Sequence, residues 1–208
     1  IATARKPAEA EALNAMAAAG GNIVVEALDV TDFEGMEALA GKYADQPIDI
    51  LLSNAALTPR YKSAFKPVDG VDFETARASY EINALGPLKL AQLFMDNVAA
   101  SEQKKIIAMS SKAGSFEAGP KMPMMYSYRG SKAALNMYMH VLSYESAKRD
   151  VIVTLLSPGM VNTTPGFNNP QGMTPEESVT QLMTVIDGLT MEHNGQFLDY
   201  SDGSTVDW

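Results

Sequence analysis

Short apolar segments alternate along the whole chain with longer segments in which apolar residues recur at helical spacing. The apolar segments predict strands at residues 1–4, 22–30, 48–54, 105–111, 151–159 and 195–200. The helical pattern predicts helices at about 7–19, 33–44, 73–100, 126–148 and 175–188. Several strands are apolar at nearly every position, which indicates burial on both faces. The alternation predicts one α/β domain over residues 1–208, with a Rossmann-type, doubly wound parallel sheet covered by helices on both faces.

The first predicted strand begins at Ile1, inside the apolar stretch IATAR. A doubly wound sheet would normally have another strand between those at 1–4 and 48–54, and without it two buried edges would keep unpaired backbone groups. We therefore expect the natural protein to have about 30 further residues upstream, the size of the missing βα unit with its glycine-rich pyrophosphate loop. Without that loop, we expect the polypeptide to be inactive.

Composition narrows the class of protein. The formal net charge of -9 argues against a nucleic-acid binder or a polybasic membrane-surface protein. The chain has no cysteine, which excludes disulfides and thiolate metal sites and fits a cytoplasmic location. The two histidines, His140 and His193, have no acidic or histidine neighbour at the spacing of metal ligands, so we expect no catalytic zinc. No apolar run approaches the roughly 20 residues that span a bilayer.

Ligands of a parallel sheet bind at the carboxyl ends of its strands, so the residues after each predicted strand are candidates for a site. Tyr128 and Lys132 open the helix that follows the fourth of these strand ends, and their spacing places them on one helical face. An ammonium beside a phenol favours the phenolate, which would make the phenol a usable acid and base. Most tyrosine–lysine pairs at this spacing are simply a half-buried ring beside a solvated amine. Other motifs in the chain are therefore needed to distinguish a catalytic pair from an ordinary one.

Several motifs resemble, in order, those of the short-chain dehydrogenase/reductase family over essentially the whole chain. They are LDVTD at 28–32, SNAA at 53–56, Asn83 in EINALG, the serine pair in IIAMSSKAGS, YRGSK at 128–132, and SPGMV followed by Thr163. Each motif is weak alone, but their order and spacing on alternating strands and helices make the resemblance specific. The later part of the chain is most similar to the carbonyl-reductase branch.

The resemblance implies a catalytic tetrad of Asn83, Ser111, Tyr128 and Lys132. Tyr128 would exchange a proton with the substrate oxygen, and Ser111, the second serine of the pair, would hydrogen-bond that oxygen. Lys132 would lower the pKa of Tyr128 and hold the nicotinamide ribose. Asn83 would position a water that connects Lys132 to solvent.

The resemblance also implies a nicotinamide cofactor. Its binding residues would be Arg5, Asp29, Val30, Asn54, Ala55, Ala56, Tyr128, Lys132, Pro158, Gly159, Val161 and Thr163. Arg5 follows the strand whose end discriminates between the two nicotinamide cofactors, and arginine suits the 2'-phosphate, so we expect NADP(H) rather than NAD(H). Ala56 departs from the family pattern, which has glycine there, and its methyl would either crowd the cofactor or be absorbed by a small backbone shift.

The substrate implied by the resemblance is a small-molecule carbonyl compound or secondary alcohol. Phe116, Met122, Met124 and Met125 either line an apolar pocket for it or pack in their own loop or a subunit contact, and residues 160–169 are a candidate lid. The family also implies a homo-oligomer, a dimer or a tetramer. The alternative function is a catalytically idle nucleotide-binding or signalling protein. A methyltransferase on a similar sheet would explain neither YRGSK nor the serine pair.

Overall fold

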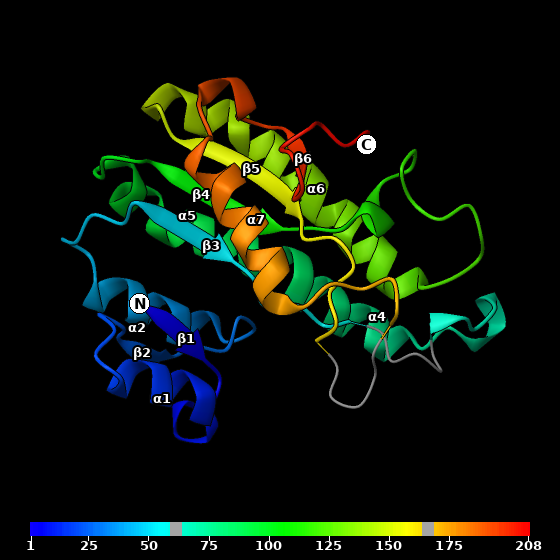
Figure 1. The fold of residues 1–208 in the computed structure, drawn as a ribbon, viewed down its shortest axis with the longest axis horizontal. Helices are drawn as coiled ribbons and strands as arrows, with labels where there is room; N and C mark the ends of the chain where they lie inside the picture. Colours follow the sequence, from blue (N-terminus) through cyan, green and yellow to red (C-terminus); the bar gives the residue numbers. More distant parts are fainter. Residues whose placement is uncertain (59–63, 164–168) are drawn as a thin grey trace. The chain divides into compact units, whose positions relative to one another are not determined.

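The computed structural model describes residues 1–58, 64–163 and 169–208, and the chain divides into two compact units, Ile1–Gln46 and Pro47–Trp208 (Figure 1). The fold is the predicted parallel α/β class. The described strands form a two-stranded sheet, β1-β2, and a four-stranded sheet, β3-β4-β5-β6, in which every pairing is parallel. That the two units act as a single domain stays a prediction.

The first unit is built on β1 (Ala2–Ala4) and β2 (Val25–Ala27). Its helices are α1 (Glu11–Ala18) and α2 (Phe33–Lys42), and the carboxylate of Asp32 caps α2 by accepting the N–H of Gly35. The strand predicted over 22–30 is much shorter than expected. Because β2 pairs only with β1 among the described strands, few of its backbone groups are tied into a ladder.

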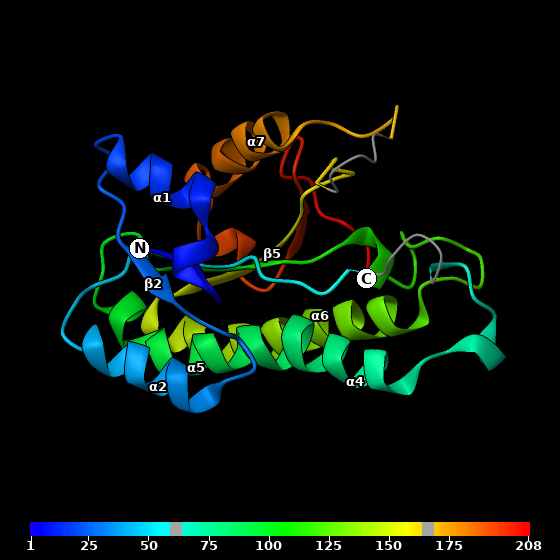
Figure 2. The ribbon, with the colours of Figure 1, turned by 90° about the horizontal axis from the view of Figure 1, so that it is seen from below.

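The second unit contains β3 (Ile50–Ser53), β4 (Lys105–Met109), β5 (Ile152–Ser157) and β6 (Phe197–Asp199). Every residue of β4 and β5 is buried, as their apolar sequences predict. The helices α5 (Gly86–Ala99) and α6 (Tyr126–Ser146) lie on one face of this sheet, and α7 (Pro175–Asp187) lies on the other (Figure 2). None of the described helices is long and apolar enough to cross a membrane.

Each face of the second sheet has its own apolar core. Val98 of α5 and Leu135 of α6 pack against one side of β4 and β5. Leu182 and Ile186 of α7 pack against the other side. Successive side chains of β4 and β5 point to opposite faces of the sheet and so contribute to both cores. Because both faces are apolar, polar groups can gather only at the ends of the strands, and ligands bind at the carboxyl ends.

The helix predicted over 73–100 consists of α4 (Phe73–Tyr80), a π-helical turn at Glu81–Leu85, and α5. Pro87 explains the change from α-helical to π-helical hydrogen bonding, because it has no N–H to donate to the carbonyl of Asn83 four residues earlier. Asn83 lies in the π turn and is fully buried. Such turns inside helices are frequent at functional sites.

Candidate active site

The carboxyl end of β4 carries the serine pair, and the structure gives the two serines different partners. The hydroxyl of Ser110 is buried and donates to the side-chain oxygen of Asn136 over 2.5 Å. Ser111 leaves the strand and caps the short turn that follows, with its hydroxyl oxygen 3.2 Å from the N–H of Ala113. The Ser111 side chain also lies near enough to the Tyr128 phenol to act on its pKa, which it works to lower. The structure therefore brings the second serine, and not the first, to the tyrosine.

Tyr128 and Lys132 lie at the start of α6, one turn apart, as their spacing predicts. The Nζ atom of Lys132 is 5.8 Å from the centre of the Tyr128 ring. The ammonium is buried and donates to the backbone oxygen of Met109 over 2.7 Å. Met109 is the last residue of β4, so this bond attaches the lysine to the strand end that carries Ser111.

Burial determines the electrostatics of this pair. It lowers the pKa of Lys132 to about 8, because removing an ammonium from water disfavours its charged form. It also raises the pKa of Tyr128, and the nearby Ser111 side chain only partly opposes that shift. The net shift of the Tyr128 pKa is therefore upward, set by burial, and the expectation that Lys132 lowers this pKa stays a prediction.

A close backbone approach holds Lys132 in place. A Cβ atom added to Gly114 would lie 2.7 Å from the Cβ of Lys132 and 2.8 Å from its carbonyl carbon. No larger residue fits without moving α6 away from the turn after Ser111. The glycine in SSKAGS thus has a packing reason that its sequence context did not reveal.

Asn83 joins two segments that flank the site. Its amide oxygen accepts the N–H of Leu57 over 2.6 Å, and its amide nitrogen donates to the carbonyl of Leu57 over 3.0 Å. The same nitrogen lies 2.9 Å from the hydroxyl of Ser131, the residue before Lys132. Asn83 therefore ties the stretch after β3 to α6, while the water expected beside it stays a prediction.

The other predicted cofactor residues fall in both units. Arg5, Asp29 and Val30 lie in the first unit, at or after its strands, and the Asp29 carboxylate binds the N–H and hydroxyl of Thr31, which lower its pKa. The remaining residues lie in the second unit, after β3 and β5: Asn54, Ala55, Ala56, Pro158, Gly159, Val161 and Thr163. Ala56 is exposed and has no positive φ, so its backbone does not require the family's glycine.

Gly159 is a position where only glycine fits. Its φ is +76°, and an added Cβ would lie 2.6 Å from a ring carbon of Tyr200 and 2.9 Å from the terminal methyl of Met173. The glycine lets the chain turn sharply after β5. Residues 164–168 of the candidate lid lie outside the described residues.

A cavity of 410 Å³ adjoins Tyr128 in the second unit. It is lined by Leu57, Thr58, Lys66, Gly70, Val71, Asp72, Thr75, Ser79, Met125, Tyr126, Ser127 and Tyr128. Of the side chains predicted to form an apolar pocket, Met125 alone is in this lining, and Phe116 is 84% exposed. The wall opposite α6 comes instead from the segment before α4 and from α4 itself, and it includes the polar side chains of Lys66, Asp72, Thr75 and Ser79.

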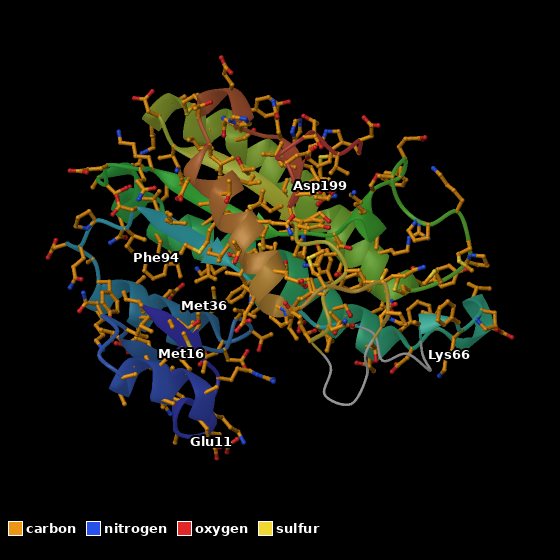
Figure 3. All side chains as sticks on the ribbon, viewed as in Figure 1. Glu11, Met16, Met36, Lys66, Phe94 and Asp199 are labelled. Atoms are coloured by element: carbon orange, nitrogen blue, oxygen red, sulfur yellow. The ribbon has the colours of Figure 1, made fainter. Side chains whose placement is uncertain are left out.

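An ion pair that sequence reasoning missed lies beside the serine. The side chain of Lys112, the residue after Ser111, places its Nζ 2.6 Å from Oδ2 of Asp199, which lies at the carboxyl end of β6 (Figure 3). Burial would raise the pKa of Asp199, but the bonds from Lys112 and Ser201 outweigh it and lower the pKa. The DYSDG stretch offered no sign of this pairing beyond its position after a predicted strand.

Replacing Asp199 with asparagine is expected to lower the free energy of unfolding by about 1 kcal/mol at pH 7, because the ion pair between this buried carboxylate and the half-exposed Lys112 is lost. The pKa of Asp199 is lowered by folding, so its stabilisation is present above the unfolded pKa of about 3.9 and is lost as the pH falls through the folded pKa. The difference between the two proteins in urea unfolding should therefore shrink below about pH 4. The exposed Asp202→Asn is the control, and an equal loss there would contradict the assignment.

The fold and this cluster together define the class of protein. A buried lysine with a half-buried tyrosine and serine, at the carboxyl edge of a parallel sheet, places it among the Rossmann-type α/β proteins. The sequence model of the short chain dehydrogenase family matches residues 1–171. The chain belongs to the short-chain dehydrogenase family, a family of oxidoreductases.

Individual relatives support the same assignment. C-signal from Myxococcus xanthus is 33% identical over 174 residues, which cover 83% of this chain and 100% of that protein. The NADPH-bound carbonyl reductase from chicken fatty liver has a similar structure, with a TM-score of 0.88 and 26% identity over 99% of this chain and 86% of that one. The carbonyl reductase Sniffer of D. melanogaster gives the same TM-score, identity and coverage. The similarity to the carbonyl-reductase branch is thereby confirmed.

Proposed function

We propose that this protein transfers a hydride between NADP(H) and a carbonyl compound or secondary alcohol, with Tyr128 as general acid and base. The observation that carries the proposal is the cluster at the end of β4, where Tyr128 lies next to Ser111 and one helical turn from the buried Lys132. The reduction consumes one hydride and one proton, and the tyrosine supplies the proton.

The buried lysine supports a nicotinamide cofactor. Lys132 is 2% exposed, and within the described part of the chain its ammonium makes one hydrogen bond, to Met109. An ammonium has three N–H donors, so two are left to bind a ligand in a place that excludes most water. The two hydroxyls of a ribose are suitable acceptors. When bound, the cofactor supplies or accepts the hydride.

The chain's own groups then manage the proton and the developing charge. Tyr128 donates its phenolic proton to the carbonyl oxygen during reduction and removes it from the alcohol during oxidation. Ser111 donates a hydrogen bond to the same oxygen as negative charge develops there. The raised pKa of Tyr128 keeps the phenol protonated at neutral pH, which suits reduction.

The remaining predicted residues complete the proposed cofactor site. Asn54, Ala55, Ala56, Pro158, Gly159, Val161 and Thr163 are proposed to contact the nicotinamide half, and Asp29 and Val30 the adenine. Arg5 is proposed to bind the 2'-phosphate of NADP. It is exposed after β1, and its neighbour Lys6 is already paired with Glu9 over 3.0 Å. The chicken carbonyl reductase that this chain resembles was solved with NADPH.

We expect the purified protein to bind NADPH more tightly than NADH when nicotinamide fluorescence is titrated. Arg5→Ala should weaken NADPH binding about tenfold, because a charged hydrogen bond to the phosphate is lost, and leave NADH binding unchanged. Lys6→Ala is the matched control and should change neither. Equal loss of both cofactors in Arg5→Ala would contradict the role proposed for the arginine.

The alternative is a nucleotide-binding or signalling protein without turnover, which the name of the relative C-signal favours. The two functions differ in one observable outcome. NADPH binding together with reduction of carbonyl compounds supports the enzyme, and NADPH binding without reduction across a broad set of aldehydes and ketones supports the alternative.

A further inference from the structure

The cavity beside Tyr128 has no role yet beyond its contact with the phenol. Its 410 Å³ lies in the range of about 300–1,000 Å³ typical of sites for small molecules. We propose, resting on the function proposed above, that it binds the non-reacting arm of the substrate and selects carbonyl compounds whose arm ends in a carboxylate. Lys66 would bind the carboxylate, and Ser79 would hydrogen-bond the arm.

Ser79 is a buried residue whose hydroxyl has no hydrogen-bond partner among the described residues. It lies on α4, is 2% exposed and lines the cavity. No side-chain hydrogen bond involves it within the part of the chain that the structure describes. Buried hydroxyls are almost always hydrogen-bonded, so a free one in a cavity wall indicates a place for a ligand's polar atom.

The two charged side chains that line the cavity, Asp72 and Lys66, differ in the bonds that they make to the protein. The carboxylate of Asp72 caps α4 and accepts the hydroxyl of Thr75 over 2.7 Å and the N–H of Glu74 over 3.0 Å. These bonds, and the charge of Lys66, lower the pKa of Asp72. Lys66 makes no ion pair of its own among residues 1–58, 64–163 and 169–208. The Lys66 ammonium is therefore available to bind a ligand. A carboxylate has the opposite charge and can accept its hydrogen bonds.

Local packing limits where the Lys66 side chain can go. Figure 3 shows Lys66 on the segment that leads into α4. A Cβ added to Gly70 would lie 3.3 Å from the Cβ and 3.4 Å from the Cδ of Lys66. The bare backbone of Gly70 thus lies against the aliphatic stem of the lysine, and both residues line the cavity. An ammonium on a supported stem loses less freedom when it binds an anion.

The two walls of the cavity are also joined to each other. Met125, directly before α6, has a φ of +53°, which is uncommon for a residue with a side chain. Its N–H donates to the carbonyl of Ala64 over 2.7 Å. This bond connects the start of the Tyr128 helix with the segment that carries Lys66. A strained residue held in this way at a cavity wall is typical of a ligand site.

The test compares 4-carboxybenzaldehyde with its neutral methyl ester, which has the same reacting group. We expect the wild-type protein to prefer the carboxylate in kcat/KM and Lys66→Met to reduce that preference about threefold to fivefold, as for an exposed ion pair. Added salt should reduce the wild-type preference in the same direction. Lys121→Met, which removes a lysine paired with Glu117 outside the cavity, should leave the preference unchanged.

Benzoate binding provides a second measurement, which does not depend on turnover. Benzoate should shift the backbone NMR signals of Ser79 and Lys66 in the wild-type protein, and both Lys66→Met and Ser79→Ala should weaken that binding. An equal substrate preference in wild type and Lys66→Met, or benzoate shifts that survive both substitutions, would overturn the inference. If neither aldehyde is reduced while benzoate still binds in a Lys66-dependent way, the proposed reaction is wrong and the anion site stands.

Discussion

Replacing Tyr128 with phenylalanine is expected to lower kcat for carbonyl reduction by about 10²–10⁴-fold, the usual contribution of a positioned acid. The substitution removes one oxygen from a half-buried ring and keeps the ring's packing beside Lys132. KM and the binding of NADPH should change little, because the phenolic proton matters in the transition state rather than in binding. Single-turnover and steady-state rates measured at saturating NADPH check this expectation.

Tyr126 provides the matched control for that experiment. It lies two residues earlier, lines the same cavity and is 43% exposed. Tyr126→Phe removes the same atom from the same kind of ring, yet it should lower kcat far less than Tyr128→Phe, because the Tyr126 hydroxyl is not placed to give a proton to the reacting oxygen. If Tyr128→Phe keeps wild-type turnover, or if the two variants lose activity equally, Tyr128 is not the acid.

Much of the architecture could be predicted because it depends on local patterns. The continuous apolar runs of β4 and β5 predicted buried parallel strands, and the helical pattern over 175–188 predicted α7, which begins with a capping box of Thr174 and Glu177. The four-residue spacing of Tyr128 and Lys132 likewise placed both at one end of α6. In each case, neighbours in sequence determine the outcome.

The parts that could not be predicted depend on contacts between distant segments. The acceptor of Lys132 is the backbone oxygen of Met109, a group that every residue carries, so no sequence pattern could mark it. The Lys112–Asp199 pair joins the ends of two strands in the sheet, and part of the cavity wall comes from the segment before α4, for which no strand or helix was predicted. The pKa of Tyr128 is raised because burial, a property of the whole fold, outweighs the lowering effect of Ser111.

Replacing Asn83 with alanine is expected to affect both stability and activity. The side chain is fully buried, and its loss leaves the N–H and carbonyl of Leu57 without the amide that satisfies them. Each unsatisfied buried group costs roughly 1–3 kcal/mol, so we expect the free energy of unfolding to fall by about 3 kcal/mol. Urea unfolding of the two proteins, with equal slopes, would measure this loss.

The effect on activity has a separate cause. Asn83 connects Leu57, in the cavity wall, to Ser131, which directly precedes Lys132. Without that connection the two walls around Tyr128 can move apart, and small displacements of catalytic groups reduce rates strongly. We therefore expect the folded fraction of Asn83→Ala to have a kcat at least about tenfold below that of the wild type.

Asn194→Ala distinguishes a loss of stability from a loss of positioning at the site. The Asn194 amide also joins two segments by hydrogen bonds, but it does so away from Tyr128. It accepts the N–H of Val153 over 2.8 Å and donates to the carbonyl of Ser143 over 2.9 Å, so it joins β5 to α6 near the end remote from Tyr128. Asn194→Ala should lose comparable stability and keep the wild-type kcat per folded molecule. If both variants lose activity only in proportion to their unfolded fraction, Asn83 serves the fold and has no positioning role in catalysis.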